Sequence, residues 1–333
     1  MSIPHQHRLS SNFSKNMTKT LSGLTTLGIF LVNTLGFIDT DTGSALGCGR
    51  QWPLCNNHFI PSTWDIHTMI EYGHRGFVAL VTLLLLIFVT LAWINYGRWI
   101  EVRALGLIAV SFVFLEALLG ALGVVFGDPP AELATHFGVS LIAFSAVLLL
   151  HLVIRQIDRL PYAKDQTVPA PLRPFSIPRS FMRITFFTLA YLYIAMYIGA
   201  YVANSRSADA FRGLLLPQER MTANNHVFWI DSVHRSIGVG LLLLVIYLLA
   251  KAYSLRQHRN DLWHITLGIV SCTVLQILAG ILLIASQLAI YAQLLHTAIV
   301  TVLFAALCYL ALQTLPEPSA RTRQLPQTYL PEH

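Results

Sequence analysis

Eight long runs of apolar residues, separated by short polar segments, dominate the chain. They cover residues 19–38, 72–95, 104–126, 131–154, 181–204, 232–254, 262–286 and 289–313. A helix needs roughly 20 mainly apolar residues to cross the hydrocarbon core of a bilayer. The runs are long and lack the strict alternation of barrel strands, which favours helices. The pattern predicts an all-α integral membrane protein with eight transmembrane helices.

Composition and charge fit this picture. Of the 333 residues, 55% are hydrophobic and 11% are charged, and a soluble domain of this length would need more polar surface. The net charge of +6 is uneven: if the N-terminus lies inside, 16 of the 22 basic residues fall on the inner side. This distribution matches the positive-inside rule with both termini cytoplasmic, so the basic charge indicates topology and no nucleic-acid partner. We expect the bacterial cytoplasmic membrane; a mitochondrial inner membrane is less favoured, because the N-terminal segment is short for a transit peptide.

The second half of the chain repeats the first. His74-Arg75 recurs as His234-Arg235, the segment 115–120 (LEALLG) recurs at 275–280 (LQILAG), and His136 recurs as His296; every pair is separated by 160 residues. Three pairs of matching positions that share one offset predict a duplicated four-helix unit. Because four is even, both copies enter the membrane from the same side, as parallel repeats.

The repeat predicts five segments along the chain. A cytoplasmic tail (1–18) is followed by an N-terminal four-helix bundle (19–154) that carries an outer loop at 39–70. A proline-rich, basic cytoplasmic linker (155–180) leads to a C-terminal four-helix bundle (181–313) and a cytoplasmic tail (314–333).

The four repeated histidines are candidate heme ligands. In each half, one histidine lies near the outer end of the second helix and one near the outer end of the fourth, so the two lie at the same depth. Ionisable groups in lipid are costly and are usually functional. Two histidines that face each other across a four-helix core suit the axial positions of a heme. Zinc is the rival, but it prefers ligands that converge tetrahedrally.

Charged residues accompany the first histidine of each half. Glu71 and Asp231 lie three residues before their histidines, on the same helix face. Helix capping is the alternative to a chemical role; both interpretations of Asp231 stay open, whereas chemistry is preferred for Glu71. Arg75 and Arg235 are expected to pair with heme propionates or with the neighbouring acids, although snorkelling to the interface is an alternative.

The remaining polar candidates have simpler interpretations. Cys48 and Cys55 lie in the outer loop, where an oxidising compartment would permit a disulfide. Glu116 and its counterpart Gln276 are interpreted as sources of hydrogen bonds between helices.

Together these residues resemble the heme A synthase family. The resemblance rests on GSALGCGRQWPLC in the first outer loop, EYGHR at the start of the second helix, the histidine that begins the fourth, and the HR and final His of the second half. It covers all eight predicted helices. Many relatives carry a second cysteine pair in the outer loop between helices 5 and 6; here that region, 204–225, has no cysteine.

The resemblance implies an enzyme that oxidises a methyl substituent of heme O to the formyl group of heme A by successive hydroxylations, for cytochrome oxidase assembly. It implies that His74 and His136 hold heme O as substrate, that Glu71 is the catalytic carboxylate, and that Cys48 and Cys55 form a functional redox pair. It implies heme b as cofactor, held by His234 and His296. Heme O synthase and cytochrome oxidase assembly factors are the implied partners.

Two other classes of function stay open. A non-enzymatic diheme electron-transfer protein would need the histidines but neither Glu71 nor the cysteine loop. A heme transporter would be expected to show broken helices, and the apolar runs contain no proline at mid-depth. The sequence does not identify the electron donor.

Overall fold

The computed structural model describes residues 4–127, 129–160, 172–173, 175, 177–219 and 226–316. Its α-helices are α1 (Pro4–Asp41), α2 (Ile66–Tyr96), α3 (Ile100–Phe126), α4 (Pro130–Asp158), α5 (Arg179–Asn204), α6 (His226–Leu255), α7 (Asn260–Ala285) and α8 (Ile290–Thr314), with a short 3-10 helix, η1 (Ser207–Ala210). All eight α-helices are long and apolar enough to cross a membrane. The predicted all-α, eight-helix membrane architecture is therefore confirmed.

Three helices begin at least six residues earlier than the apolar runs suggested. α1 begins at Pro4, so most of the expected tail 1–18 is helical, and α2 and α6 begin at Ile66 and His226. Hydropathy misses the start of α1 because its first turns are polar, and the start of α2 because Asp65, His67 and Thr68 lower the local hydropathy. At α2, the carboxylate of Asp65 accepts hydrogen bonds from the amides of His67 and Thr68, at 3.0 Å each, which caps the helix. These bonds, led by that from the Thr68 amide, hold the pKa of Asp65 below its usual value.

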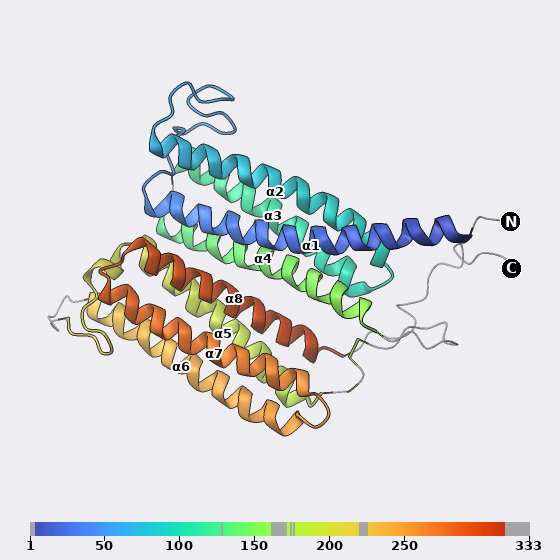
Figure 1. The fold of residues 1–333 in the computed structure, drawn as a ribbon. Coiled ribbons are helices and arrows are strands. Elements are labelled where there is room, and N and C mark those ends of the chain that lie inside the picture. The colour runs from blue at the N-terminus through green and yellow to red at the C-terminus, as the bar shows by residue number, and fades with distance from the viewer. Residues whose placement is uncertain are drawn as a thin grey trace.

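The eight helices form two groups, seen one above the other in Figure 1. In the first, each of α1 to α4 packs against the next and α4 returns to α1; α5 to α8 close a second ring in the same way. α2 therefore lies diagonally opposite α4, and α6 lies diagonally opposite α8. α1 and α5 begin at the same end of the molecule (Figure 1), as parallel repeats require. The duplication itself stays a prediction.

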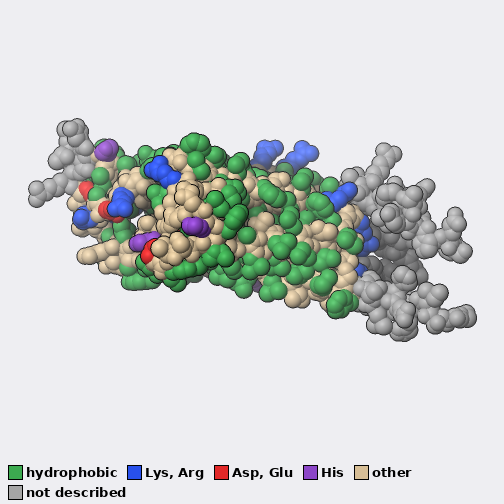
Figure 2. Space-filling model, turned by 90° about the horizontal axis from the view of Figure 1, so that it is seen from above, with side chains coloured by type: hydrophobic (Ala, Val, Ile, Leu, Met, Phe, Trp, Pro, Cys, Tyr) green, Lys and Arg blue, Asp and Glu red, His purple; other side chains and the backbone are tan. Residues whose placement is uncertain are grey.

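The two rings meet along α4 and α8. α4 packs against α5 and α8, and α8 also contacts α1. α4 is accordingly the most buried of the eight spans. The outer faces of the other helices expose large apolar side chains such as Leu83, Phe187 and Leu243. In Figure 2, hydrophobic side chains cover the middle of the visible face and charged ones lie mainly towards its ends, as expected for a bilayer-spanning surface.

The predicted cytoplasmic segments lie partly outside the described residues: 1–3, 161–171, 174, 176 and 317–333 are not described. Within the linker 155–180, Arg173 donates a hydrogen bond to Glu101 at the start of α3, at 2.6 Å. Both residues are buried. This pair attaches the linker to the end of the molecule opposite the cysteine loop.

Candidate functional site

The four repeated histidines lie on diagonal helices. His74 is on α2 and His136 on α4, whereas His234 is on α6 and His296 on α8. His74 lies within electrostatic range of His136, and His296 lies within range of His234. Each ring of four helices therefore holds one pair of imidazoles that approach each other across its core.

Every one of these imidazoles lies against a glycine of an adjacent helix. A Cβ atom added to Gly36 of α1 would lie 3.3 Å from the Cε1 atom of His74, and one added to Gly199 of α5 would lie 3.2 Å from that of His234. The other two contacts involve the glycines of the repeated segment: Gly120 of α3 against His136 at 3.4 Å, and Gly280 of α7 against His296 at 3.5 Å. Side chains at these positions would crowd the rings, so the glycines make room for them.

The imidazole nitrogens test whether a heme fits. The Nδ1 atoms of His74, His234 and His296 are buried and have no hydrogen-bond partner among the described residues. A buried polar atom without a partner is destabilising, and coordination of iron would engage these rings. Each ring offers two imidazoles, which fit a heme because its iron already holds four porphyrin nitrogens. The described residues contain no group of three or more His, Cys, Asp or Glu side chains that could hold a metal ion.

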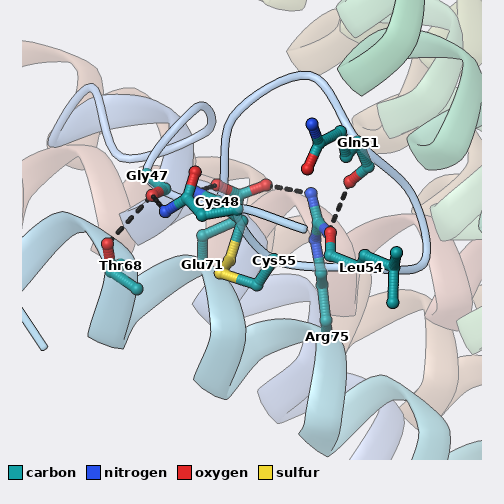
Figure 3. A network of polar contacts seen from close by, with 9 residues as sticks. Gly47, Cys48, Gln51, Leu54, Cys55, Thr68, Glu71 and Arg75 are labelled. Atoms are coloured by element: carbon teal, nitrogen blue, oxygen red, sulfur yellow. Dashed lines mark hydrogen bonds and ion pairs between the residues drawn. A yellow bond between two sulfur atoms is a disulfide. The ribbon is translucent and has the colours of Figure 1, made fainter. Parts of the chain in front are cut away.

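A charged network of Glu71 and Arg75 fixes the cysteine loop on α2 (Figure 3). The carboxylate of Glu71 is buried, at 2% exposure. One of its oxygens accepts a hydrogen bond from the Cys48 amide at 2.5 Å, and the other pairs with the guanidinium of Arg75. Arg75 also donates to the backbone carbonyls of Gln51 and Leu54, at 3.1 Å each. Glu71 and Arg75 thus connect α2 to both sides of the loop.

The loop itself is closed by a disulfide and packed closely on α2. Cys48 and Cys55 are bonded to each other and are almost fully buried, which confirms the predicted disulfide. The hydroxyl of Thr68 donates to the carbonyl of Gly47 at 2.9 Å. A Cβ added to Gly47 would lie 2.4 Å from the backbone carbon of His67, so only glycine permits this approach.

The second half repeats the acid–arginine pair with different connections. Arg235 donates to both carboxylate oxygens of Asp231, at 2.6 and 2.7 Å, and Asp231 is fully buried. Arg235 also donates to the backbone carbonyl of Arg212 in the preceding outer loop, at 3.2 Å. Asp231 therefore gives both oxygens to Arg235, whereas Glu71 divides its oxygens between Arg75 and the cysteine loop.

These placements remove the capping explanation for both acids. Neither α2 nor α6 has an acidic residue in its first turn, because Glu71 and Asp231 lie further along their helices. Glu116, interpreted from the sequence as a source of interhelical hydrogen bonds, lies on α3 with a carboxylate oxygen 3.4 Å from Nε2 of His136.

Comparisons with known proteins agree with this arrangement. Residues 19–308 match a family described as cytochrome oxidase assembly protein. The chain belongs to this family. Similar proteins include heme A synthases of Staphylococcus saprophyticus, 32% identical over 298 residues, and Staphylococcus haemolyticus, 30% identical over 298 residues. Another is a heme A synthase of Staphylococcus aureus, 32% identical over 300 residues. Each alignment covers 89% of this chain and 95% of the relative.

Family membership covers both rings of helices, because the matched range begins in α1 and ends in α8. The sequence did not predict two sets of contacts: those of the glycines with the histidines, and those of Arg75 with the loop. Gly36 and Gly199 are not separated by the 160-residue offset of the repeat, so the repeat does not pair them. The carbonyls that bind Arg75 belong to Gln51 and Leu54, and a backbone carbonyl carries no sequence signal. Asp65 is a sequence signal for the start of α2, but it does not indicate these contacts.

Substitution of Gly47 tests how firmly the loop is attached. In Gly47→Ala, the new methyl group meets the backbone of His67, so we expect the loop to lift from α2 and the buried disulfide to become accessible. Reduction by a thiol, followed by alkylation, should be about tenfold faster, which corresponds to about 1.4 kcal/mol of easier local opening. Gly268→Ala is the control, because nothing lies within 4 Å of a Cβ there. Equal reduction rates in both variants would contradict the attachment.

Proposed function

We propose that this protein is a heme A synthase, which oxidises a methyl substituent of heme O to the formyl group of heme A. The relatives named heme A synthase support the reaction. The observation that carries it to this site is Glu71, a buried carboxylate one helical turn before His74 that is also bonded to the disulfide loop. An electron carrier would need the histidine pairs alone, so this additional group favours an enzyme.

The two rings take different roles in this proposal. His74 and His136 bind heme O as substrate in the ring that carries the cysteine loop. His234 and His296 bind heme b, which supplies one-electron transfer when bound. Gly36 and Gly120 leave space against the substrate ligands, and Gly199 and Gly280 do so in the second ring.

The reaction has a definite electron balance. Conversion of a methyl to a formyl group adds one oxygen, counted as water, and removes four electrons and four protons. Two successive hydroxylations account for this change: the first gives an alcohol, and the second gives a hydrated aldehyde that loses water. Each C–H bond broken releases a proton, so an acceptor near the methyl group is useful.

Glu71 is the side chain that we assign to this task. Arg75 compensates its charge, which lets a carboxylate persist in a buried position. The bond from the Cys48 amide fixes the orientation of the carboxylate. A fixed carboxylate can accept the released proton or stabilise positive charge that develops on the macrocycle. The disulfide loop supports this group from the side opposite α2.

Heme extraction tests the proposed reaction. The protein is purified from cells that also make heme O, and its hemes are identified by mass. We expect heme A or its hydroxylated intermediate together with heme b. Heme b alone, with substrate present and the disulfide intact, would contradict the enzyme and indicate a diheme electron carrier.

Substitution of Glu71 separates chemistry from loop attachment. Glu71→Gln can still accept the bond from the Cys48 amide, so we expect both hemes and the disulfide to be retained. Loss of the negative charge should lower heme A formation by about 100-fold or more, measured as product per bound heme. Asp231→Asn, the matched change in the other ring, should keep heme A formation. Full heme A production by Glu71→Gln would rule out the catalytic role.

A further inference from the structure

The cysteine loop also has an apolar side, which takes no part in the charged network. Phe59 is 80% exposed and Ile60 is 70% exposed, and the tryptophans on either side of them, Trp52 and Trp64, are each more than half exposed. Single apolar residues at a surface are common, but a cluster of them marks a site that binds another apolar surface. The segment 52–64, which contains all four, has no Lys, Arg, Asp or Glu.

Hydrogen bonds within the loop hold these apolar side chains outside. The backbones of Cys55 and His58 bond to each other in both directions, at 2.8 and 3.0 Å, and form a tight turn directly before Phe59. The backbone amide of Asn57 donates to the side-chain oxygen of Gln51 at 2.6 Å. The polar contacts are thus made within the loop and with α2, so the exposure of the apolar side chains is part of the folded loop.

The loop lies beside the membrane-spanning helices. In Figure 1, the chain between α1 and α2 extends sideways from α2, on the side away from α5 to α8, and turns back towards the middle of the molecule. At the end of the segment, the ring of Trp64 meets that of Tyr72 of α2 edge to face, with 5.7 Å between the ring centroids. A segment in this position faces the bilayer and not the solution beyond the helix ends.

The exposed side of α2 continues the apolar surface of the loop. Ile66 and Met69 near the start of α2, and Leu80 and Leu83 further along, are all more than half exposed. They share one side of the helix, because their spacings of three and eleven residues are close to whole turns of 3.6 residues. Where α2 spans the membrane, this side contacts lipid. The apolar surface therefore runs without a break from the bilayer to the loop.

We propose that the segment 52–64 is a membrane anchor, which lies in the headgroup region of the leaflet on its own side with Phe59 and Ile60 among the acyl chains. Trp52 and Trp64 suit this boundary, because an indole ring has an apolar body and a polar N–H group. The amide, imidazole and hydroxyl side chains of the same segment can bond to headgroups and water. Lipid is the partner that this position favours, because the exposed side chains adjoin the lipid-facing side of α2.

The anchor would hold the cysteine loop from two sides. On one side, the loop bonds to Glu71 and Arg75 of α2. On the other side, Phe59 and Ile60 would attach it to the bilayer. This inference does not depend on the proposed function, because it concerns only the loop and the lipid.

Spin labelling of the full-length protein in nanodiscs of phosphatidylethanolamine and phosphatidylglycerol tests the proposal. The label is attached to Phe59→Cys in a Cys272→Ser, Cys308→Ala background, which removes the free cysteines, and the disulfide is kept oxidised. We expect collisions with a water-soluble nickel reagent to be about tenfold rarer than at Arg50→Cys, because burial of an apolar group of this size is favoured by at least that factor. Arg50 is an exposed, charged position of the same loop, and Leu80→Cys gives the value for a lipid-facing position.

Two results would overturn the anchor. One is a collision rate at position 59 as high as that at position 50, which would place the segment in water. The other is protection of position 59 in native membranes but not in nanodiscs of the purified protein, which would show that another protein covers the loop. If Phe59→Cys does not fold, Ile60→Cys takes its place with the same expectation.

Discussion

Four imidazoles inside membrane-spanning helices are the constraint on which the rest of this structure depends. The bilayer core offers no water to satisfy a polar ring, so each histidine needs a partner within the protein. The chain provides space against a glycine of an adjacent helix, and it leaves ring nitrogens of His74, His234 and His296 without a protein partner among the described residues. The diagonal placement of each pair follows from four helices packed in consecutive order. A ligand that engages both members of a pair satisfies this constraint.

The two rings share this plan and differ in the groups around it. In both, an acid and an arginine one turn apart connect a helix to the outer loop that precedes it. In the first ring, Glu71 also holds the disulfide loop, and Glu116 lies against His136. In the second ring, both carboxylate oxygens of Asp231 accept hydrogen bonds from Arg235, and an amide, Gln276, replaces Glu116. The additional carboxylates are therefore concentrated in the ring that we assign to chemistry.

The sequence was sufficient to predict the helices, because hydropathy over roughly 20 residues reflects the thickness of a bilayer. The fixed spacing of the repeat placed the four histidines on the correct helices. The polar start of α2 was missed, since its capping aspartate lowers the local hydropathy. The contacts of Arg75 with two loop carbonyls, and of Gly47 with α2, depend on how an irregular loop folds back. Backbone acceptors leave no mark in a sequence, so only the structure revealed how Glu71 is held.

The most direct test of the account is the heme content of two matched histidine variants. His74→Ala and His234→Ala are purified from cells that make heme O, and the ratio of each heme type to protein is measured. Heme binding by diagonal pairs predicts that His74→Ala loses heme O and heme A but keeps heme b, and that His234→Ala loses heme b. Loss of the same heme type from both variants, or retention of both types by either, would contradict the two-site arrangement.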